Sequence, residues 1–154
     1  MKSSAIEHIW SILCSSYSVD STTNNASLFN IIEKINISVA KEELANAQRA
    51  GGVGVVPMAY TVVSRLRRND LHSPTQFSYR VQVLDGSGRE LASTERMVEA
   101  KGQARYMRIS STLNGFPISQ SGEYTVVIQI QESADQEYID LGTVPFEVEV
   151  TPVG

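Results

Sequence analysis

The chain has 154 residues, 42% of them hydrophobic and 19% charged, and carries a net charge of −4. At this length a chain buries about 68–70% of its unfolded surface, so we expect one domain, residues 1–154, that folds without disulfides or metal ions. The single cysteine, Cys14, excludes an intramolecular disulfide, and the net negative charge argues against a general nucleic-acid-binding protein.

The N-terminal part of the chain predicts two strands separated by a polar loop. Residues 5–14 are apolar on both alternating faces, which indicates a strand covered on both sides, at a sheet centre or under a partner. Residues 15–25 are mostly polar and predict a loop. Residues 28–39 would suit a helix or a strand, and their β-branched content favours a strand. Alternation places Phe29, Ile31, Ile35, Ile37 and Val39 on one face of this segment, with Glu33 as the exception.

Residues 41–50 are the best helix candidate. Glu42 and Glu43 lie in the expected first turn and Arg49 in the last, which suits the helix dipole. Gly51 stands where a C-terminal cap belongs. The glycines that follow lack the Gly-Lys-Ser/Thr sequence of a phosphate-binding loop, so we interpret them as a turn into the next strand.

Alternation of apolar and polar residues recurs through the rest of the chain. It is clearest in residues 122–131, where Tyr124, Val126, Ile128 and Ile130 share one face and mostly polar side chains occupy the other. Asp85-Gly-Ser-Gly88 predicts a hairpin turn. Similar alternating segments are residues 58–66, 77–83, 91–98, 107–113 and 144–150, and the weaker pattern in 91–98 is typical of an edge strand.

These elements predict an all-β fold: an antiparallel two-sheet β-sandwich of about eight strands, immunoglobulin-like or related, with one short helix. Each predicted core residue lies on the apolar face of its strand. The set comprises Tyr79, Val81, Tyr124, Val126, Ile128, Phe146 and Val148.

The stretch Gly122-Glu-Tyr124-Thr-Val126 resembles strand F of an immunoglobulin-like fold, whose pattern is Asp-x-Gly-x-Tyr-x-Cys. Gly122 and Tyr124 match this pattern, whereas Gln120 and Val126 replace the aspartate and the cysteine. The resemblance implies a tyrosine corner. In such a corner the Tyr124 ring is buried and its hydroxyl binds the backbone near the turn before Gly122.

A second resemblance covers the first part of the chain. The sequence Ile12-Leu-Cys14, the polar turn from Asp20 and the following segment up to Glu33 are similar to the opening of a group of small uncharacterised bacterial β-sandwich proteins. In that group a strand ending in Leu-Cys leads through a polar turn into a second strand. The resemblance implies a fold and no activity.

No motif predicts a catalytic, cofactor or metal site. His8, Cys14 and His72 are the only soft metal ligands, and no two of them have the spacing of a metal site. Alternation places His8 and Cys14 on the same strand face, roughly 20 Å apart. Cys14 with His72 is the one nucleophile–base pair that remains open, but Cys14 ends an apolar strand, so we expect it to be buried and unreactive. Residues 135–140 suit a solvated acidic loop better than a calcium site.

Charge is unevenly distributed along the chain. Eight of the nine arginines lie in residues 65–108, whereas residues 109–154 contain seven acidic side chains and no basic one. Pairing of these segments as neighbouring strands would make the charges a structural ladder. A binding face is the other interpretation.

Arg65, Arg67 and Arg80 are the candidate partner-binding residues. Alternation directs all three away from the core, and we expect residues 58–66 to pair with residues 77–83, which would bring the three arginines together on one face. The aromatic side chains of these strands point the other way, which argues against a nucleic-acid site.

The leading hypothesis from sequence is therefore a non-enzymatic, cytoplasmic β-sandwich protein-interaction module without a cofactor. Its partner would be a protein, acidic or a second copy of the chain. The cytoplasmic assignment rests on the lone cysteine and on an N-terminus that does not form a signal peptide, and the absence of a long apolar stretch argues against membrane association. The alternatives are a structural subunit of a phage-like or other assembled particle and an enzyme whose site is built from loops.

Overall fold

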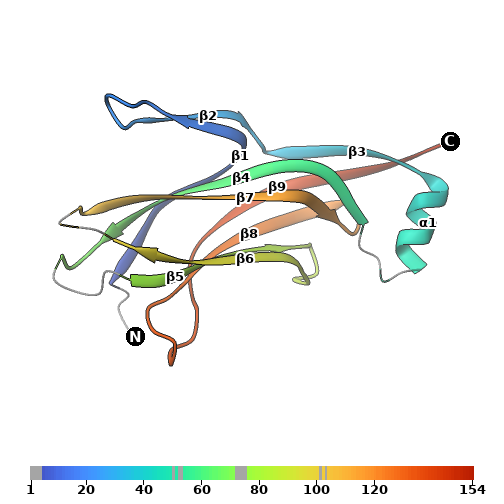
Figure 1. Ribbon diagram of the computed structural model, residues 1–154. Coiled ribbons are helices and arrows are strands. Elements are labelled where there is room, and N and C mark those ends of the chain that lie inside the picture. Colours follow the sequence, from blue (N-terminus) through green and yellow to red (C-terminus); the bar gives the residue numbers. More distant parts are fainter. Residues whose placement is uncertain (1–4, 50, 52–53, 72–75, 101, 103) are drawn as a thin grey trace.

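Alternating residues form long strands over most of the chain (Figure 1). The computed structural model describes residues 5–49, 51, 54–71, 76–100, 102 and 104–154. Within these ranges there are nine strands and one helix. They are β1 (Ile6–Val19), β2 (Ala26–Ile31), β3 (Lys34–Ala40), α1 (Lys41–Arg49), β4 (Gly54–Arg68), β5 (Gln76–Leu84), β6 (Glu90–Glu99), β7 (Tyr106–Ile118), β8 (Gly122–Gln131) and β9 (Ile139–Val153).

The strands form two sheets that pack face to face. One sheet has the order β2-β1-β4-β7 and the other β3-β9-β8-β5-β6. Neighbouring strands are antiparallel except for the β3–β9 pair, which is parallel. The predicted all-β two-sheet sandwich with one short helix is therefore confirmed, and β6 lies at a sheet edge as its weak alternation predicted.

The core lies between the inward faces of the two sheets. Every predicted core residue is at most 3% exposed, so the assignment of inward faces for β5, β8 and β9 is confirmed. An aromatic cluster joins the sheets: the Phe116 ring centroid lies 5.0 Å from that of Tyr60 and 5.6 Å from that of Phe146. Such edge-to-face contacts add to the stabilisation from burial.

The segment 28–39 is extended, as predicted, but it is two strands instead of one. The chain crosses from one sheet to the other between β2 and β3, with Ile32 buried and Glu33 exposed at the crossing. Phe29 and Ile31 are 52% and 54% exposed whereas Ile35 and Ile37 are buried, so the predicted common face is wrong. Alternation fixes a common face only within one strand, and the crossing breaks it here. This division also explains why nine strands form instead of about eight.

The predicted loop over residues 15–25 is shorter than expected, because β1 continues to Val19. The turn is organised by Asp20, whose Oδ1 accepts hydrogen bonds from the backbone N–H groups of Thr22 (2.8 Å) and Thr23 (2.7 Å). These hydrogen bonds hold the pKa of the Asp20 carboxyl below its usual value, and the bond from Thr23 makes the largest contribution.

The predicted helix and hairpin turn are both present. Helix α1 ends at Arg49, and Gly51 has a φ of 106°, the left-handed conformation expected after a helix. Ala50, the predicted last helical residue, lies outside the described residues. In the β5–β6 turn the N–H of Gly88 donates to the Asp85 carbonyl over 3.0 Å.

The tyrosine corner implied by the strand F resemblance is confirmed. The Tyr124 side chain is fully buried, and its Oη accepts hydrogen bonds from the backbone N–H groups of Ser119 (2.8 Å) and Gln120 (3.1 Å). The same hydroxyl donates to the Gln120 carbonyl over 2.7 Å. The corner thus fixes the turn between β7 and β8.

A chain of polar side chains crosses the core. His8 Nε2 lies 2.8 Å from Ser11 Oγ, which is 2.7 Å from Ser64 Oγ, which in turn is 2.8 Å from the buried Tyr79 hydroxyl. The chain links β1 and β4 in one sheet to β5 in the other. The His8 ring also lies where a Cβ on Gly142 would stand, within 2.6 Å, so the glycine makes room for the imidazole.

We expect His8 to make stability depend on pH. Burial lowers its pKa from 6.5, so the folded state favours the neutral ring while the unfolded chain takes up a proton more readily. Its contribution to the free energy of unfolding should be complete above about pH 6.5 and should fall as the pH drops below that value. Urea titrations at about pH 7.5 and pH 5.5 would measure the loss. The free energy of unfolding of a His8→Gln variant should fall less between these two pH values than that of the unmodified protein. An equal fall in both proteins would show that His8 is not the cause of the pH dependence.

Candidate partner-binding cleft

The outer face of the β1-β4-β7 sheet carries a row of long side chains. A bulge between His8 and Trp10 shifts the alternation of β1, and Trp10 then lies opposite Arg65. Arg65 in turn lies opposite Arg108 on β7. Because residues paired across neighbouring strands project to the same side of a sheet, Trp10, Arg65 and Arg108 stand side by side on this face.

The end of the β1–β2 hairpin folds over this outer face (Figure 1, upper left). The Arg108 guanidinium donates to the carbonyl of Asn24 over 3.0 Å and to its Oδ1 over 3.3 Å. Farther along, the Tyr17 hydroxyl lies 2.5 Å from Ser110 Oγ. The hairpin thereby covers part of a sheet face that would otherwise face solvent, consistent with the complete burial of Val63.

Cys14 lies in this covered region, and its predicted burial is confirmed at 0% exposure. Burial raises the pKa of its thiol, and a backbone hydrogen bond with Ser16 opposes part of that rise. The expectation that His8 and Cys14 share a strand face is wrong, since the bulge between them sends them to opposite faces. The Cys14–His72 pair is untested because His72 lies outside the described residues.

We expect Cys14 to react slowly with thiol reagents in the native protein. Only the thiolate reacts readily, and a buried thiol with a raised pKa holds little of it at neutral pH. Labelling at about pH 7 should be complete in denaturing urea and far slower without it. Rapid stoichiometric labelling of the folded protein would contradict this and would revive an enzymatic interpretation.

A cleft of about 700 Å³ lies between the hairpin and the outer sheet face. The sheet side is lined by Trp10, Arg65, Tyr106 and Arg108, and the hairpin side includes residues 23–26. We call this the arginine cleft. It combines two flat aromatic side chains with two guanidinium groups, the side-chain types enriched at energetically important positions of protein interfaces.

The cleft is electropositive. Within the part of the chain that the structure describes, neither Arg65 nor Arg108 has a carboxylate within 4.0 Å, and no acidic residue lines the cleft. The Arg65 guanidinium lies 4.5 Å from the centroid of the Tyr106 ring, a cation–π contact that orients it. At the margin, Arg67 Nε is 3.8 Å from a carboxylate oxygen of Glu7.

The predicted grouping of Arg65, Arg67 and Arg80 is wrong. Arg65 and Arg67 share the outer face of β4, but Arg80 is on β5, and the two strands belong to different sheets. Arg80 is held in a local ladder on its own sheet: its guanidinium lies 3.8 Å from the Tyr138 ring centroid, and its Nε donates to Gln129 Oε1 over 2.7 Å. Arg65 therefore remains the strongest of the three candidates for partner binding.

Sequence reasoning missed Trp10, Tyr106 and Arg108 as site residues. The position of Arg108 could have been found, since alternation with the buried Ile109 directs it outward. The bulge that turns Trp10 outward and the folding of the hairpin over the sheet leave no comparable signal in the local pattern.

The described lining of the cleft supplies groups suited to binding. Among the described residues, its lining contains no histidine, cysteine or carboxylate that would serve as a nucleophile or general base. Over the described ranges, no group of three or more His, Cys, Asp and Glu side chains is placed to hold a metal ion. Nor does the described part of the chain contain a helix of the length and apolar character needed to cross a bilayer.

No protein-family model and no curated protein matches this sequence. Among solved structures, the chain is similar to a glycosyl hydrolase family 2 member from Bacteroides cellulosilyticus, with 14% identity and a TM-score of 0.44 over 64% of this chain. It is also similar to a beta-glucuronidase from glycoside hydrolase family 2, with 15% identity and a TM-score of 0.41 over 64% of this chain. The chain spans only 13% and 11% of the lengths of these two proteins, and similarity at this level carries no argument about activity.

Proposed function

We propose that the protein is a non-enzymatic, cytoplasmic interaction module of immunoglobulin-like type that binds an acidic segment of a partner protein in the arginine cleft. The observation that carries the proposal is the pair Arg65 and Arg108, which face one cleft without a carboxylate of the described residues beside them. The lone cysteine supports the cytoplasmic part of the proposal, and the tyrosine corner at Tyr124 supports the immunoglobulin-like part.

Both guanidinium groups are oriented before a partner arrives. Tyr106 holds Arg65 from one side, and Asn24 receives two of the donor groups of Arg108. A guanidinium has five N–H donors, so both arginines keep donors for a carboxylate, and paired N–H donors bind a carboxylate in two-point fashion. Orientation in advance reduces the side-chain entropy lost on binding.

The single tryptophan provides a direct test, because Trp10 lines the cleft and its fluorescence reports on occupancy. Titration with a tryptophan-free peptide rich in aspartate and glutamate should change this fluorescence, with an affinity that weakens as salt rises. Arg65→Glu and Arg108→Glu should each weaken binding by about tenfold to a hundredfold. The matched control is Arg80→Glu on the other sheet, which should leave binding unchanged.

Two outcomes would overturn the proposal. One is an unchanged Trp10 signal at millimolar peptide, and the other is an equal loss of binding in the Arg80→Glu control. Light scattering on the purified protein separates the main alternative, because a monomer or dimer agrees with an interaction module, whereas large regular oligomers would favour a structural subunit of an assembled particle.

A further inference from the structure

We infer a second interaction site, independent of the arginine cleft: the free edge of β3 accepts an extended segment of a partner protein as an added strand. β3 is the last strand of its sheet, and among the described residues it pairs only with β9. The N–H of Glu147 on β9 donates to the carbonyl of Glu33, so the backbone N–H and C=O groups of residue 33 point toward β9. Successive residues of a strand direct these groups to opposite sides. The backbone groups of Lys34, Asn36 and Ser38 therefore point away from β9, toward the open edge.

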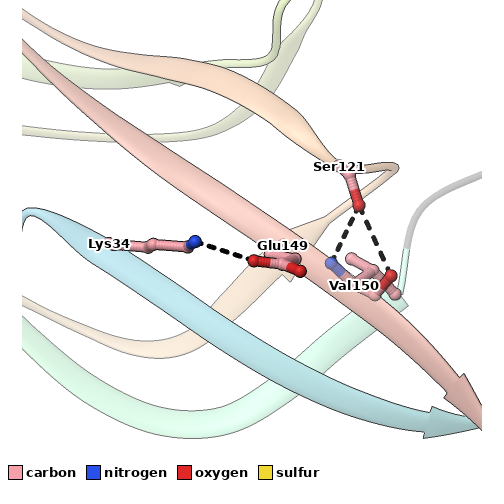
Figure 2. A network of polar contacts seen from close by, with 4 residues as sticks. All are labelled: Lys34, Ser121, Glu149 and Val150. Carbon is pink, nitrogen blue, oxygen red and sulfur yellow. Dashed lines mark hydrogen bonds and ion pairs between the residues drawn. The ribbon is translucent and has the colours of Figure 1, made fainter.

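The neighbouring strand β9 shows how an open edge is closed elsewhere in the same sheet (Figure 2). β9 extends past the start of β8, which leaves the backbone of Val150 without a strand partner on that side. The Ser121 hydroxyl fills the gap: it accepts from the Val150 N–H over 2.9 Å and donates to the Val150 carbonyl over 3.4 Å. Pro152 lies two residues farther along β9 and has no backbone N–H to donate.

The other sheet edges carry recognised obstacles to strand addition. β6 has four charged side chains among its ten residues. β7 contains Pro117, and β2 is only six residues long and contains Asn30 in a left-handed conformation with φ of 51°. β3 has no glycine, proline or bulge, and its one charged side chain, Lys34, is neutralised by Glu149 at 2.7 Å (Figure 2).

An apolar groove of about 340 Å³ lies beside this edge. It runs between the end of β3, the start of β4 and helix α1, and its lining includes Ile37, Val39, Leu44, Val56 and Ile118. A strand added to β3 would continue the sheet and direct every second side chain to the inward face, where the groove lies. Edge and groove together thus match an extended segment with alternating apolar residues.

The groove decides between a partner segment and a second copy of this chain. If β3 paired with β3 of a second copy, the side chains available for the groove of the neighbour would be Ile35 and Ile37. These are already buried in their own core, at 7% and 8% exposure, so they could not fill that groove. A segment without a folded body of its own has inward side chains free to enter it.

Charge at the two ends of β3 specifies the segment further. Glu33 is exposed just before the strand, and Glu42 and Glu43 are exposed just after it, with Lys41 beside them leaving a net negative charge. None of the three glutamates is in an ion pair with the described residues. The complementary occupant is a segment of alternating apolar residues with a basic residue at each end.

The test uses a labelled peptide of about nine residues in which valine and threonine alternate and lysine stands at both ends. Fluorescence anisotropy should show binding, and hydrogen exchange should show protection of the Asn36 and Ser38 amides. Ser38→Pro removes an N–H from the open edge and should weaken binding by about tenfold or more, while Ser38→Ala should not. Proline is tolerated on edge strands, and thermal melting checks that the variant folds.

Two further comparisons make the result independent of that variant. The same peptide with N-methyl groups on alternate backbone nitrogens should fail to bind in one of its two methylation patterns, since only one row of N–H groups faces β3. Val55→Lys places a charge at the groove, where Val55 is 69% exposed, and should weaken binding, whereas Met97→Lys on β6, 60% exposed, is the matched control.

The proposal is overturned if the peptide does not bind at about 1 mM, or if neither Ser38→Pro nor either methylated peptide changes binding. It is also overturned if sedimentation shows a dimer of the unliganded protein that Ser38→Pro abolishes, since the edge would then belong to a second copy. The two proposals can fail separately. If the acidic peptide gives no Trp10 fluorescence change, the arginine cleft is excluded, but the expected binding of the valine–threonine peptide to β3 is unchanged.

Discussion

Replacement of Ile128 by alanine is expected to lower the free energy of unfolding by about 2–5 kcal/mol. The side chain is fully buried at the centre of the sandwich, on β8 between β5 and β9. Its cross-strand neighbours are Val81 and Gly142, and the glycine has no side chain that could move into the space. The deletion would therefore leave a cavity that the surrounding strands close only in part.

The matched control is Gln129→Ala at the next position of the same strand. Gln129 lies on the outer face, where it accepts a hydrogen bond from Arg80 and donates one to Asp140. Both bonds are near solvent, so their loss should cost less than about 1 kcal/mol. Urea titration of both variants measures the difference. Similar losses at the two positions would show that the orientation of β8 is wrong.

The sequence predicts individual strands well where one face of the strand is buried and the other is exposed to solvent. In β5 burial alternates along the whole strand, and it alternates through most of β8 and through residues 143–151 of β9, with Val127 of β8 buried as an exception. The tyrosine corner was also predictable, because Gly122 and Tyr124 carry a local pattern that needs only the adjacent turn. These features depend on contacts within one strand or its entry turn.

Sheet membership was not predictable in the same way. β4 and β5 are consecutive in sequence, and consecutive strands often pair, yet here the chain passes from one sheet to the other between them. That passage separates Arg65 from Arg80 and removes the expected three-arginine face. The alternation pattern of each strand is the same whether its neighbour lies in the same sheet or the opposite one, so it contains no information about the choice.

The arginine cleft was hidden for a related reason. Its walls come from three strands and a hairpin turn, and only the bulge after His8 directs Trp10 to the same face as Arg65. A bulge adds one residue without changing composition, so the apolar run of residues 5–14 does not reveal it. Of the candidate site, sequence therefore found Arg65 and its outward orientation, and structure supplied the neighbours that make it a cleft.

A Tyr124→Phe substitution is expected to destabilise the protein by about 1–3 kcal/mol. The ring packs in the aromatic cluster, with its centroid 5.7 Å from that of Phe146, so the phenylalanine would keep most packing contacts. The loss comes from the hydroxyl, because the N–H groups of Ser119 and Gln120 and the Gln120 carbonyl would lose their partner in a partly buried turn. Unpaired buried groups keep their desolvation cost without a compensating bond.

Tyr60→Phe is expected not to destabilise the protein, although Tyr60 belongs to the same aromatic cluster and is also fully buried. Its hydroxyl has no hydrogen-bond partner among the described residues, and burial raises its pKa to about 12. Removing an unpaired buried hydroxyl should leave stability unchanged or raise it by about 1 kcal/mol, because the folded state no longer holds a desolvated polar group. Urea titrations of both tyrosine variants under one set of conditions would measure the contrast. A loss for Tyr60→Phe as large as that for Tyr124→Phe would mean that the Tyr60 hydroxyl is hydrogen-bonded in solution, and the account of this part of the core would be wrong.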